Sequence, residues 1–400
     1  MKRLRFLILN TDYPEYLRWL YRQNPGLENA SYKEQMRVRN KSLFGTADFY
    51  SSNLKKLGHE ALDIHVNNEF MQRAWMREHS SKFDSRSKIS RTRGYANELL
   101  LKAANTPLRY LKPLAKPFIG SPTIYSCKYN AILEAQIKYY NPDIILNHAI
   151  NEIKSEFFND LKQYYGLLIG QHAAAQLSES EDFSNYDLII TSFMPTVQWF
   201  KKRGVKAEIF KLGFEESILP QVNGWRDFKT KKIDVSFVGS FFDIHSSRTD
   251  LLETICKKFP RTKIWGPGIE HLPLNSQIRN CYQGRAWGHD MYRILGCSKI
   301  TINHHGNVLP YANNMRLYES TGMCALLITD WKNNLSDMFN PDEEVIGYRT
   351  SEECAELINY YLKHDNEREV IARAGQRRTL SEHTYYQRMQ ELEGIITEYI

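Results

Sequence analysis

Ten short apolar runs, each bounded by polar residues, recur along this chain and constrain its fold more than any other feature. They lie at 4–10, 60–66, 143–149, 165–171, 186–192, 233–240, 262–268, 299–306, 324–330 and 343–349. Each has the length of a buried β-strand. Segments with helical spacing, such as 130–143 and 196–204, lie between many of them. Because strands and helices alternate in parallel-sheet proteins, the sequence predicts an α/β fold.

The runs fall into two groups, which indicates two domains. The first group ends near Gly213 and the second begins near Ile233. A chain of 400 residues also exceeds what one hydrophobic core usually serves. We expect doubly wound domains at 1–222 and 223–382, followed by a final helix in 383–400 that packs back on the first domain. The carboxyl ends of both sheets would then face a shared ligand-binding cleft.

The composition is typical of a soluble globular chain, with 42% apolar and 25% charged residues. No apolar run approaches the roughly 20 residues of a membrane-spanning helix, and the one near the start is too short for a signal peptide. Six cysteines lie far apart without a C-x-x-C pair, which favours neither a zinc ribbon nor a disulfide scaffold. These features predict a cytoplasmic protein.

The basic character of the chain belongs to one segment, residues 71–120. This segment contains eleven Lys or Arg and three Asp or Glu, an excess of eight within a formal net charge of +7. Its cations are mixed with Trp75, Tyr95 and Tyr110. Two interpretations stay open: a solvated helical insertion, or a surface that holds the protein at the anionic inner face of a membrane. No nucleic-acid-binding module accompanies the charge, so no nucleic-acid partner is expected.

Helix signals are clear near the C-terminus. Thr350 with Glu353, and Asn366 with Glu369, have the spacing of capping boxes. The predicted final helix has an apolar stripe, formed by Tyr385, Met389, Leu392 and Ile396. We assign these residues structural roles.

The segment NNMRLYESTGMCALLITD, residues 313–330, contains the main candidate site. Asn313 can cap a helix whose first turns present Arg316 and Glu319 on the same face. The free N–H groups of a helix start and a planar guanidinium together suit a phosphate or a diphosphate. A glutamate one turn further can accept hydrogen bonds from the vicinal hydroxyls of a ribose. The alternative is that Arg316 and Glu319 only pair with each other on a helix surface.

This region resembles the carboxyl-terminal domain of the CgeB-like glycosyltransferases, which have the two-domain GT-B architecture. The likeness rests on the order of FVGS, WGPG, RAWGHDMYRILGCSKITINHHG, the Asn-x-x-Arg-x-x-Glu helix and GQRRTLSEHTYYQR, and it covers about 233–388. The amino-terminal half agrees more loosely, through GQHAAAQ, YDLIITSF and GFEESIL. The resemblance implies two Rossmann-like, doubly wound domains that face each other across a cleft.

The resemblance also implies roles for particular residues. Such enzymes bind a nucleotide-sugar donor mainly on the carboxyl-terminal domain and the acceptor on the amino-terminal one. Glu319 would hold the ribose, and Arg316 would face the diphosphate together with the helix start. Gly239 and Ser240 would let the donor approach the backbone closely. Arg248, which opens the next helix, would neutralise the departing diphosphate.

The sequence departs in one position from the retaining family 4 glycosyltransferases that these enzymes resemble. Family 4 enzymes carry two glutamates with seven residues between them, and the position eight before Glu319 is Tyr311. Other groups must therefore contact the sugar, and the candidates are Asn303, His304, His305 and Asn313. Asn314 belongs to the same predicted nucleotide-sugar site. The sugar and the stereochemical outcome stay open, although retention is favoured.

Polar residues that follow the amino-terminal runs are the candidates on the acceptor side. His148 and His172 both follow apolar runs, at the expected position of the cleft, and either can contact the donor or deprotonate the acceptor. His172 is the preferred catalytic candidate. In the loop after the first run, Asn10 is a candidate contact of the acceptor or diphosphate and Asp12 a candidate base, although both residue types are common in turns.

No cofactor and no metal are expected. His289, His304 and His305 have no carboxylate at ligand spacing, and GT-B enzymes generally work without a bound divalent ion. Neither a P-loop nor a nucleophile elbow occurs in the sequence, and Gly266–Gly268 are interpreted as a tight turn only.

The sequence therefore predicts a glycosyltransferase that moves a hexose-like unit from a nucleoside-diphosphate sugar to a glycan, a lipid-linked precursor or a protein. Two alternatives stay open. The first is a nucleotide-sugar epimerase of the same architecture, and the second is a non-catalytic glycan-binding homologue.

Overall fold

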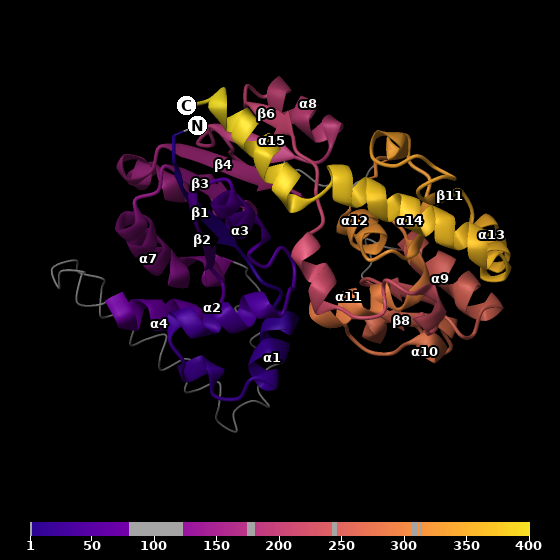
Figure 1. Cartoon of the computed structure of the whole chain (residues 1–400). Helices are drawn as coiled ribbons and strands as arrows, with labels where there is room; N and C mark the ends of the chain where they lie inside the picture. The colour runs from indigo at the N-terminus through magenta and orange to yellow at the C-terminus, as the bar shows by residue number, and fades with distance from the viewer. Residues whose placement is uncertain (1, 80–122, 174–180, 242–245, 306–309, 313) are drawn as a thin grey trace.

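The fold contains two parallel β-sheets that lie side by side and are covered by helices (Figure 1). The computed structural model describes residues 2–79, 123–173, 181–241, 246–305, 310–312 and 314–400. The first sheet has six strands in the order β2-β1-β3-β4-β5-β6, and the second has five in the order β11-β10-β9-β7-β8. In both sheets the order of strands reverses beside the first strand, which is the topology of doubly wound α/β domains.

The amino-terminal sheet is formed by β1 (Arg5–Asn10), β2 (Glu60–His65), β3 (Ile144–Asn147), β4 (Leu167–His172), β5 (Leu188–Thr191) and β6 (Ala207–Ile209). Its two faces bury alternate side chains of the same strand. Phe6 and Ile8 of β1 belong to the apolar cluster that includes α3 and α15. Leu7 and Leu9 belong to the cluster on the other face, with α7 and α8. The strand β1 is therefore covered on both sides, which explains its nearly continuous apolar run.

Helices and 3-10 turns of the amino-terminal domain are α1 (Pro14–Gln23), η1 (Leu27–Asn29), α2 (Tyr32–Lys41), α3 (Phe49–Lys56), α4 (Glu69–His79), α7 (Thr123–Tyr140), η4 (Ser155–Tyr164) and α8 (Met194–Lys202). Ser31 caps α2 with its side chain. In Figure 1, α1, α2 and α4 lie together below the sheet, away from α15.

The carboxyl-terminal sheet is formed by β7 (Ile233–Val238), β8 (Lys263–Trp265), β9 (Ser298–Asn303), β10 (Leu326–Asp330) and β11 (Ile346–Tyr348). Its helices are α9 (Ser246–Lys258), α10 (Gln277–Cys281), α11 (His289–Gly296), α12 (Met315–Gly322), α13 (Ser351–Lys363) and α14 (Asp365–Glu382), with η8 (Ile269–His271) and η9 (Leu335–Asp337). The segment between the sheets carries η5 (Glu216–Gln221) and η6 (Phe228–Thr230).

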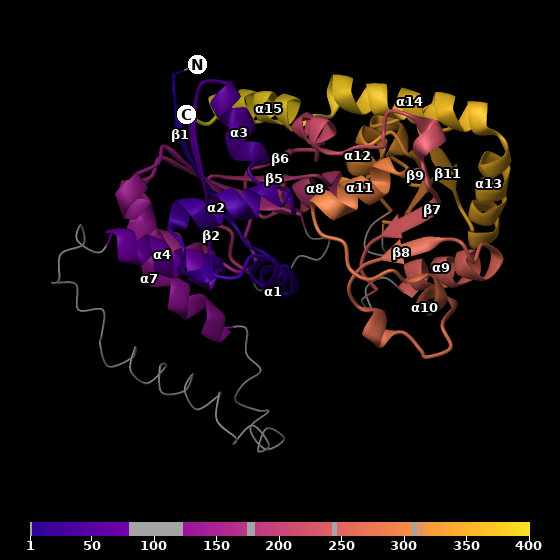
Figure 2. The same cartoon turned by 60° about the horizontal axis from the view of Figure 1, so that its bottom comes forward.

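The chain crosses between the domains twice, and the two crossings touch each other. Phe214 and Thr384 form a parallel β-bridge. Beyond Thr384 the chain continues as α15 (Tyr385–Thr397), which returns to the amino-terminal domain and packs on α3 (Figures 1 and 2). Tyr385 lies 5.4 Å, ring centre to ring centre, from both Phe49 and Tyr50. One apolar cluster thereby runs through both domains and includes Leu392 of α15 and Leu317 of α12.

The predicted α/β fold is confirmed, and each of the ten apolar runs overlaps a strand. The sequence reading missed β6, a three-residue edge strand. The predicted apolar stripe of the last helix is buried at all four positions. Thr350 caps α13 as predicted, because its side chain accepts from the N–H of Glu353.

Two expectations were wrong, and for identifiable reasons. Asn366 does not cap a helix, because α14 already begins at Asp365 and places Asn366 in its first turn. Trp75 does not contribute to a membrane-facing surface, because it is buried and its Nε1 donates to the Tyr140 hydroxyl at 3.0 Å. The rest of the basic segment, from residue 80, lies outside the described residues.

In the part of the chain that the structure describes, no helix has the length and apolarity needed to cross a membrane.

Candidate functional site

A cleft of about 540 Å³ lies between the two sheets. It is lined by residues 10–13, 39 and 44–46 of the amino-terminal domain and by residues 237–240, 248, 266–267, 286–288, 291, 303–304, 314–316 and 319 of the carboxyl-terminal domain. We call it the interdomain cleft. Its walls include the loops that follow β1, β7, β8 and β9, so it lies at the carboxyl edges of both sheets, where α/β proteins bind ligands.

The start of α12 forms part of the cleft wall, and Asn314 is its N-cap. The side chain of Asn314 accepts from the N–H of Leu317 at 3.3 Å, while its Nδ2 donates to Asn303 Oδ1 at 2.9 Å. The cap is therefore Asn314 and not Asn313, which lies outside the described residues. Asn303 donates in turn to Thr329 Oγ1 at 3.0 Å. This chain of amides fixes the helix start against the ends of β9 and β10.

Arg316 and Glu319 both line the cleft and pair with each other. Arg316 Nη1 lies 2.7 Å from Glu319 Oε2, and the Tyr292 hydroxyl donates to Glu319 Oε1 at 3.4 Å. The side chains are 15% and 6% exposed, so this is no surface ion pair. Burial raises the pKa of Glu319, and the charge of Arg316 opposes that shift. The ion pair expected as the alternative therefore exists, but in the wall of a cavity large enough for a ligand.

Glycines bring the loops after β7 and β8 into close contact. Gly239 and Ser240 line the cleft, as predicted for a loop that a ligand approaches. Gly266 also lines it, with φ of +153°, and a Cβ at this position would lie 1.7 Å from Gly239 O. The interpretation of Gly266–Gly268 as a turn alone was therefore incomplete. Only glycine fits where the two loops meet at the cleft wall.

Arg248 ties two loops of the cleft together. Its Nη1 donates to Ser240 O at 3.0 Å, and its Nη2 donates to His304 O at 2.8 Å. Burial lowers the pKa of Arg248 to about 10, against the attraction of Asp330, so it stays charged at neutral pH. The predicted cation thus lies in the cleft wall, with much of its donor capacity used to position the loops after β7 and β9.

The two histidines after β9 differ in environment. His304 lines the cleft, and burial lowers its pKa to about 4, so the ring is neutral at pH 7. His305 does not line the cleft. Its Nδ1 lies 2.7 Å from Asp330 Oδ1, and its backbone N–H donates to the same oxygen. His304 is thus the better placed of the two predicted sugar contacts.

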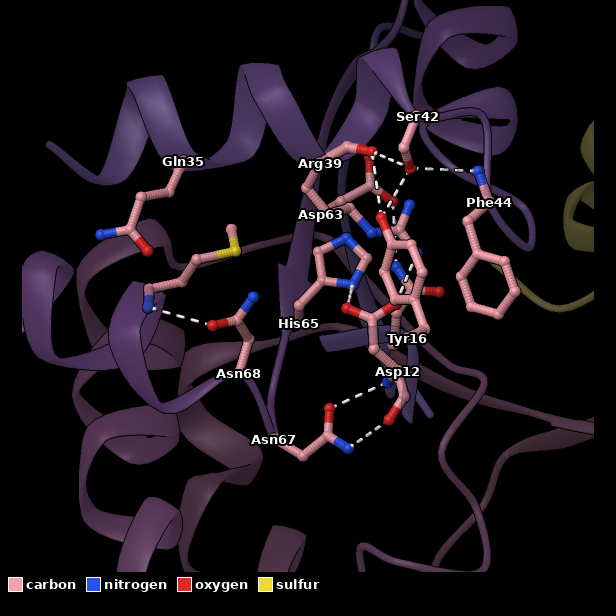
Figure 3. A network of polar contacts seen from close by, with 12 residues as sticks. Asp12, Tyr16, Gln35, Arg39, Ser42, Phe44, Asp63, His65, Asn67 and Asn68 are labelled. Atoms are coloured by element: carbon pink, nitrogen blue, oxygen red, sulfur yellow. Dashed lines mark hydrogen bonds and ion pairs between the residues drawn. The ribbon is translucent and has the colours of Figure 1, made fainter. Parts of the chain in front are cut away.

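Asp12 lies at the centre of a buried polar network in the amino-terminal wall (Figure 3). Arg39 Nη2 lies 2.6 Å from its Oδ1 and His65 Nδ1 lies 2.9 Å from its Oδ2. Burial acts to raise the pKa of Asp12, but the charges of Arg39 and His65 outweigh it and hold that pKa well below its usual range. A carboxylate so strongly stabilised is a weak proton acceptor. The expectation that Asp12 is a base is therefore not supported by its chemistry.

Asn10 and His148 form a second part of the amino-terminal wall. His148 Nδ1 lies 2.9 Å from Asn10 Oδ1, and Asn10 Nδ2 donates to Asp63 Oδ1 at 3.1 Å. Asn10 lines the cleft, whereas His148 supports it from behind. Burial lowers the pKa of His148 to about 3. His148 is therefore a neutral group that orients Asn10.

His172, the preferred catalytic candidate, does not line the interdomain cleft. It ends β4, is 1% exposed, and its ring stands edge-on to Phe200 at 5.8 Å. Burial lowers its pKa to about 4. Its catalytic role stays a prediction that this geometry does not favour.

Sequence reasoning missed residues that reach the cleft from α2 and α11. Arg39 comes from the end of α2, and Trp287 precedes α11. Trp287 packs edge-on to Phe44 at 5.1 Å, and the N–H of His289 donates to Ser42 O at 2.8 Å. A Cβ at Gly288 would lie 1.9 Å from the same carbonyl. These contacts join the domains at one end of the cleft, and no local pattern marks them.

Comparison with known proteins agrees with this architecture. Residues 248–394 match the family described as glycosyl transferase-like. The chain has the GT-B fold. A glycosyltransferase from Rickettsia africae ESF-5 is 12% identical, with a TM-score of 0.56 over 100% of this chain and 99% of that one. HepE of Anabaena in complex with UDP-glucose is 11% identical, with a TM-score of 0.57 over 99% of this chain and 100% of HepE.

AviGT4, a glycosyltransferase involved in avilamycin A biosynthesis, is 12% identical and has a TM-score of 0.54 over 99% of this chain and 97% of its own. Identities this low show a shared fold alone. No curated protein matches the sequence.

Proposed function

We propose that this protein is a glycosyltransferase that takes its sugar from a nucleoside-diphosphate donor bound in the interdomain cleft. One observation carries the proposal: Arg316, Glu319 and the capped start of α12 lie together in the wall of a cavity at the carboxyl edges of both sheets. A helix start and an arginine suit a diphosphate, and a carboxylate suits the two hydroxyls of a ribose. The glycosyl transferase-like match over residues 248–394 supports the same reaction class.

In this proposal Glu319 accepts hydrogen bonds from the ribose, and Arg316 turns part of its guanidinium towards the diphosphate. Charge grows on the diphosphate as the bond to the sugar breaks, and fixed cations and N–H groups stabilise that charge. Arg248 holds the loops at Ser240 and His304 in position for this step. Asn303, Asn314 and His304 line the region in which the sugar would lie. We keep retention of configuration as part of the proposal, as well as a CgeB-like subtype.

The proposal leaves three points open. They are the base of the donor nucleotide, the acceptor, and whether the enzyme acts at a membrane surface. HepE is described in complex with UDP-glucose, so uridine nucleotides are the first to test here. We expect transfer to a glycan, a lipid-linked precursor or a protein, without a metal cofactor.

The test is a panel of UDP-, GDP- and dTDP-sugars incubated with the full chain. We expect release of nucleoside diphosphate from at least one donor, slowly to water and faster when an acceptor is present. Conversion of one nucleotide sugar into another without release of diphosphate would identify an epimerase instead. A protein that binds none of these nucleotides would contradict the proposal and favour the non-catalytic alternative.

A further inference from the structure

Arg39 is a buried cation in the wall of the interdomain cleft with unused hydrogen-bonding capacity. It is 2% exposed, and its Nη2 lies 2.6 Å from Asp12 Oδ1. Its Nε and Nη1 have no hydrogen-bond partner among the described residues. A guanidinium has five N–H donors, and buried donors are normally paired. A partner outside the described chain, such as a ligand, would account for the unused donors.

The surroundings of Arg39 fix the guanidinium in the wall of the cleft, where little of it is exposed. Tyr16 lies beneath it, with the guanidinium carbon 5.8 Å from the ring centre. Gly45 lies beside it in the cleft wall with φ of +61°, and the one heavy atom near a Cβ built there is Arg39 Nη2, at 3.9 Å. A side chain at position 45 would therefore lie against the guanidinium in the cleft wall. The glycine keeps that place free.

Asp12 balances the charge of Arg39 but leaves part of its hydrogen-bonding capacity unused. The second oxygen of Asp12, Oδ2, lies 2.9 Å from His65 Nδ1. Asp12 is further fixed through its backbone, whose N–H donates to Asn67 Oδ1 at 2.9 Å and whose carbonyl accepts from Asn67 Nδ2 at 2.7 Å (Figure 3). Asp12 thus acts as a rigid support for Arg39.

The position of Arg39 separates it from the groups proposed for the donor. Arg248, Arg316 and the start of α12 belong to the carboxyl-terminal wall, and Arg39 belongs to the amino-terminal wall. A diphosphate held by the first wall is already provided with two cations. A third cation on the opposite wall fits a second anionic group, carried by the other substrate.

We propose that Arg39 binds an oxyanion of the acceptor, a phosphate or a carboxylate, so that the enzyme acts on an acidic acceptor and not on a neutral one. This inference rests on the proposed function, because it assigns the amino-terminal wall to the acceptor. The anion would form charge-assisted hydrogen bonds with the guanidinium beside Gly45.

The test is calorimetry on the full chain saturated with UDP, which occupies the donor side. Inorganic phosphate and glucuronate are the two probes, and glucose is the neutral comparison. We expect at least one anion to bind and glucose to bind more weakly or not at all. Arg39→Met should weaken the binding of the anion on the order of tenfold or more, because a charge-assisted hydrogen bond is lost, and should leave the affinity for UDP nearly unchanged.

A matched control is Arg37→Met, since Arg37 lies on the same helix but is exposed and pairs with Glu34. It should leave the binding of all probes as in the natural protein. Arg39→Met leaves Asp12 buried without its cation, so the double variant Asp12→Asn with Arg39→Met removes both charges and keeps the test usable if the single variant unfolds.

Three results would overturn the inference. The first is that the UDP-bound protein binds neither anion. The second is that the Arg39 variants bind the anion as tightly as the natural protein does. The third is that these variants lose affinity for UDP while their binding of the anion stays the same. Failure of the natural protein to bind any nucleotide would overturn the proposed function as well, so the two failures are distinguishable.

Discussion

Glu319 and Arg316 show how one pair of side chains can serve both structure and binding. Their ion pair satisfies two buried charges, and both groups still line the cleft. A buried carboxylate costs free energy unless it is paired, which the raised pKa of Glu319 reflects. A ribose that donates two hydrogen bonds would add partners to this carboxylate without removing its cation.

Glu319→Gln should therefore weaken the binding of a nucleoside diphosphate. The amide keeps the shape but loses the charge and half of the acceptor capacity, and a hydrogen bond to a charged group contributes about 1.5–3 kcal/mol. We expect a loss of about tenfold or more in calorimetry with UDP, GDP and dTDP. Glu356→Gln, on the exposed side of α13, is the control and should change nothing. Unaltered affinity for the best nucleotide in Glu319→Gln would exclude the proposed ribose contact.

At the scale of elements, α12 is short and depends on its cap. It has eight residues, is buried through most of its length, and begins at the amide chain of Asn314 and Asn303. An N-cap side chain contributes about 1 kcal/mol to helix stability. In α12 the cap does more, because it sets the direction of the helix start that faces the cleft.

Asn314→Ala should lower both the free energy of unfolding and the affinity for nucleotide. The comparison is Thr384→Ala, which removes the capping box of α15 at a residue that does not line the cleft. Both variants should lose about 1 kcal/mol in urea unfolding, but only Asn314→Ala should weaken UDP binding. Equal nucleotide affinities in the two variants would show that the start of α12 has no part in the site.

Gly266 carries a different kind of constraint, since it lets two loops touch. Gly266→Ala would push a methyl group into Gly239 O and must displace the loop after β7 or β8. We expect a clear loss of nucleotide binding together with a lower unfolding free energy. Gly394→Ala in α15 meets no atom within 4 Å, so it should be neutral or stabilise the helix by about 0.5–1 kcal/mol. Full nucleotide affinity in Gly266→Ala would mean that these loops do not form the site.

At the scale of the whole molecule, the two domains share one apolar cluster. It extends from the amino-terminal sheet through Phe214 and α15 to Leu317 and Met338 of the carboxyl-terminal domain. His383, beside the crossing, lies against Tyr318 and Phe339, and its Nε2 lies 2.8 Å from Met338 O. Such continuity couples the unfolding of the domains, because neither can lose its packing without exposing the other.

The free energy of unfolding should begin to fall at a pH above the range in which free carboxylates titrate. Burial lowers the pKa of His172, His304 and His383 to about 4 each, from 6.5. Between these values the unfolded chain binds more protons than the folded one, so the free energy of unfolding falls as pH falls from about 6.5 to 4, by up to about 1.4 kcal/mol per pH unit for each group. The raised pKa of Glu319 acts in the opposite sense at the lower end of this range.

Urea unfolding at pH 7.5, 6.5, 5.5 and 4.5 measures this slope. His383→Gln keeps a donor for Met338 O but cannot be protonated, so it should unfold with a shallower dependence on pH. A free energy of unfolding that stays constant from pH 7.5 to 5 would contradict the assignment of these histidines as neutral in the folded state.

Much of the architecture followed from the sequence, because strands buried on two faces leave a local pattern. Each apolar run is a short segment whose neighbours are polar, and a parallel sheet demands this at every strand. The helix with Arg316 and Glu319 was also predictable, since residues three apart share a helix face. Only the cap was assigned one residue early, which local spacing cannot distinguish when two asparagines are adjacent.

The tertiary structure alone decided which side chains meet at the cleft. Arg39 and Asp12 are 27 residues apart, Asp12 lies in the loop after β1, and His65 ends β2, so no local pattern links them. The sequence indicates only a turn at Gly266, whereas the structure places this residue in contact with Gly239. His172 was preferred over His148 from the sequence, but packing places His172 against Phe200 and outside the cleft lining, and His148 beside Asn10 of the cleft wall. Sequence determines elements through short-range periodicity, whereas a site depends on the distances between elements, which only packing sets.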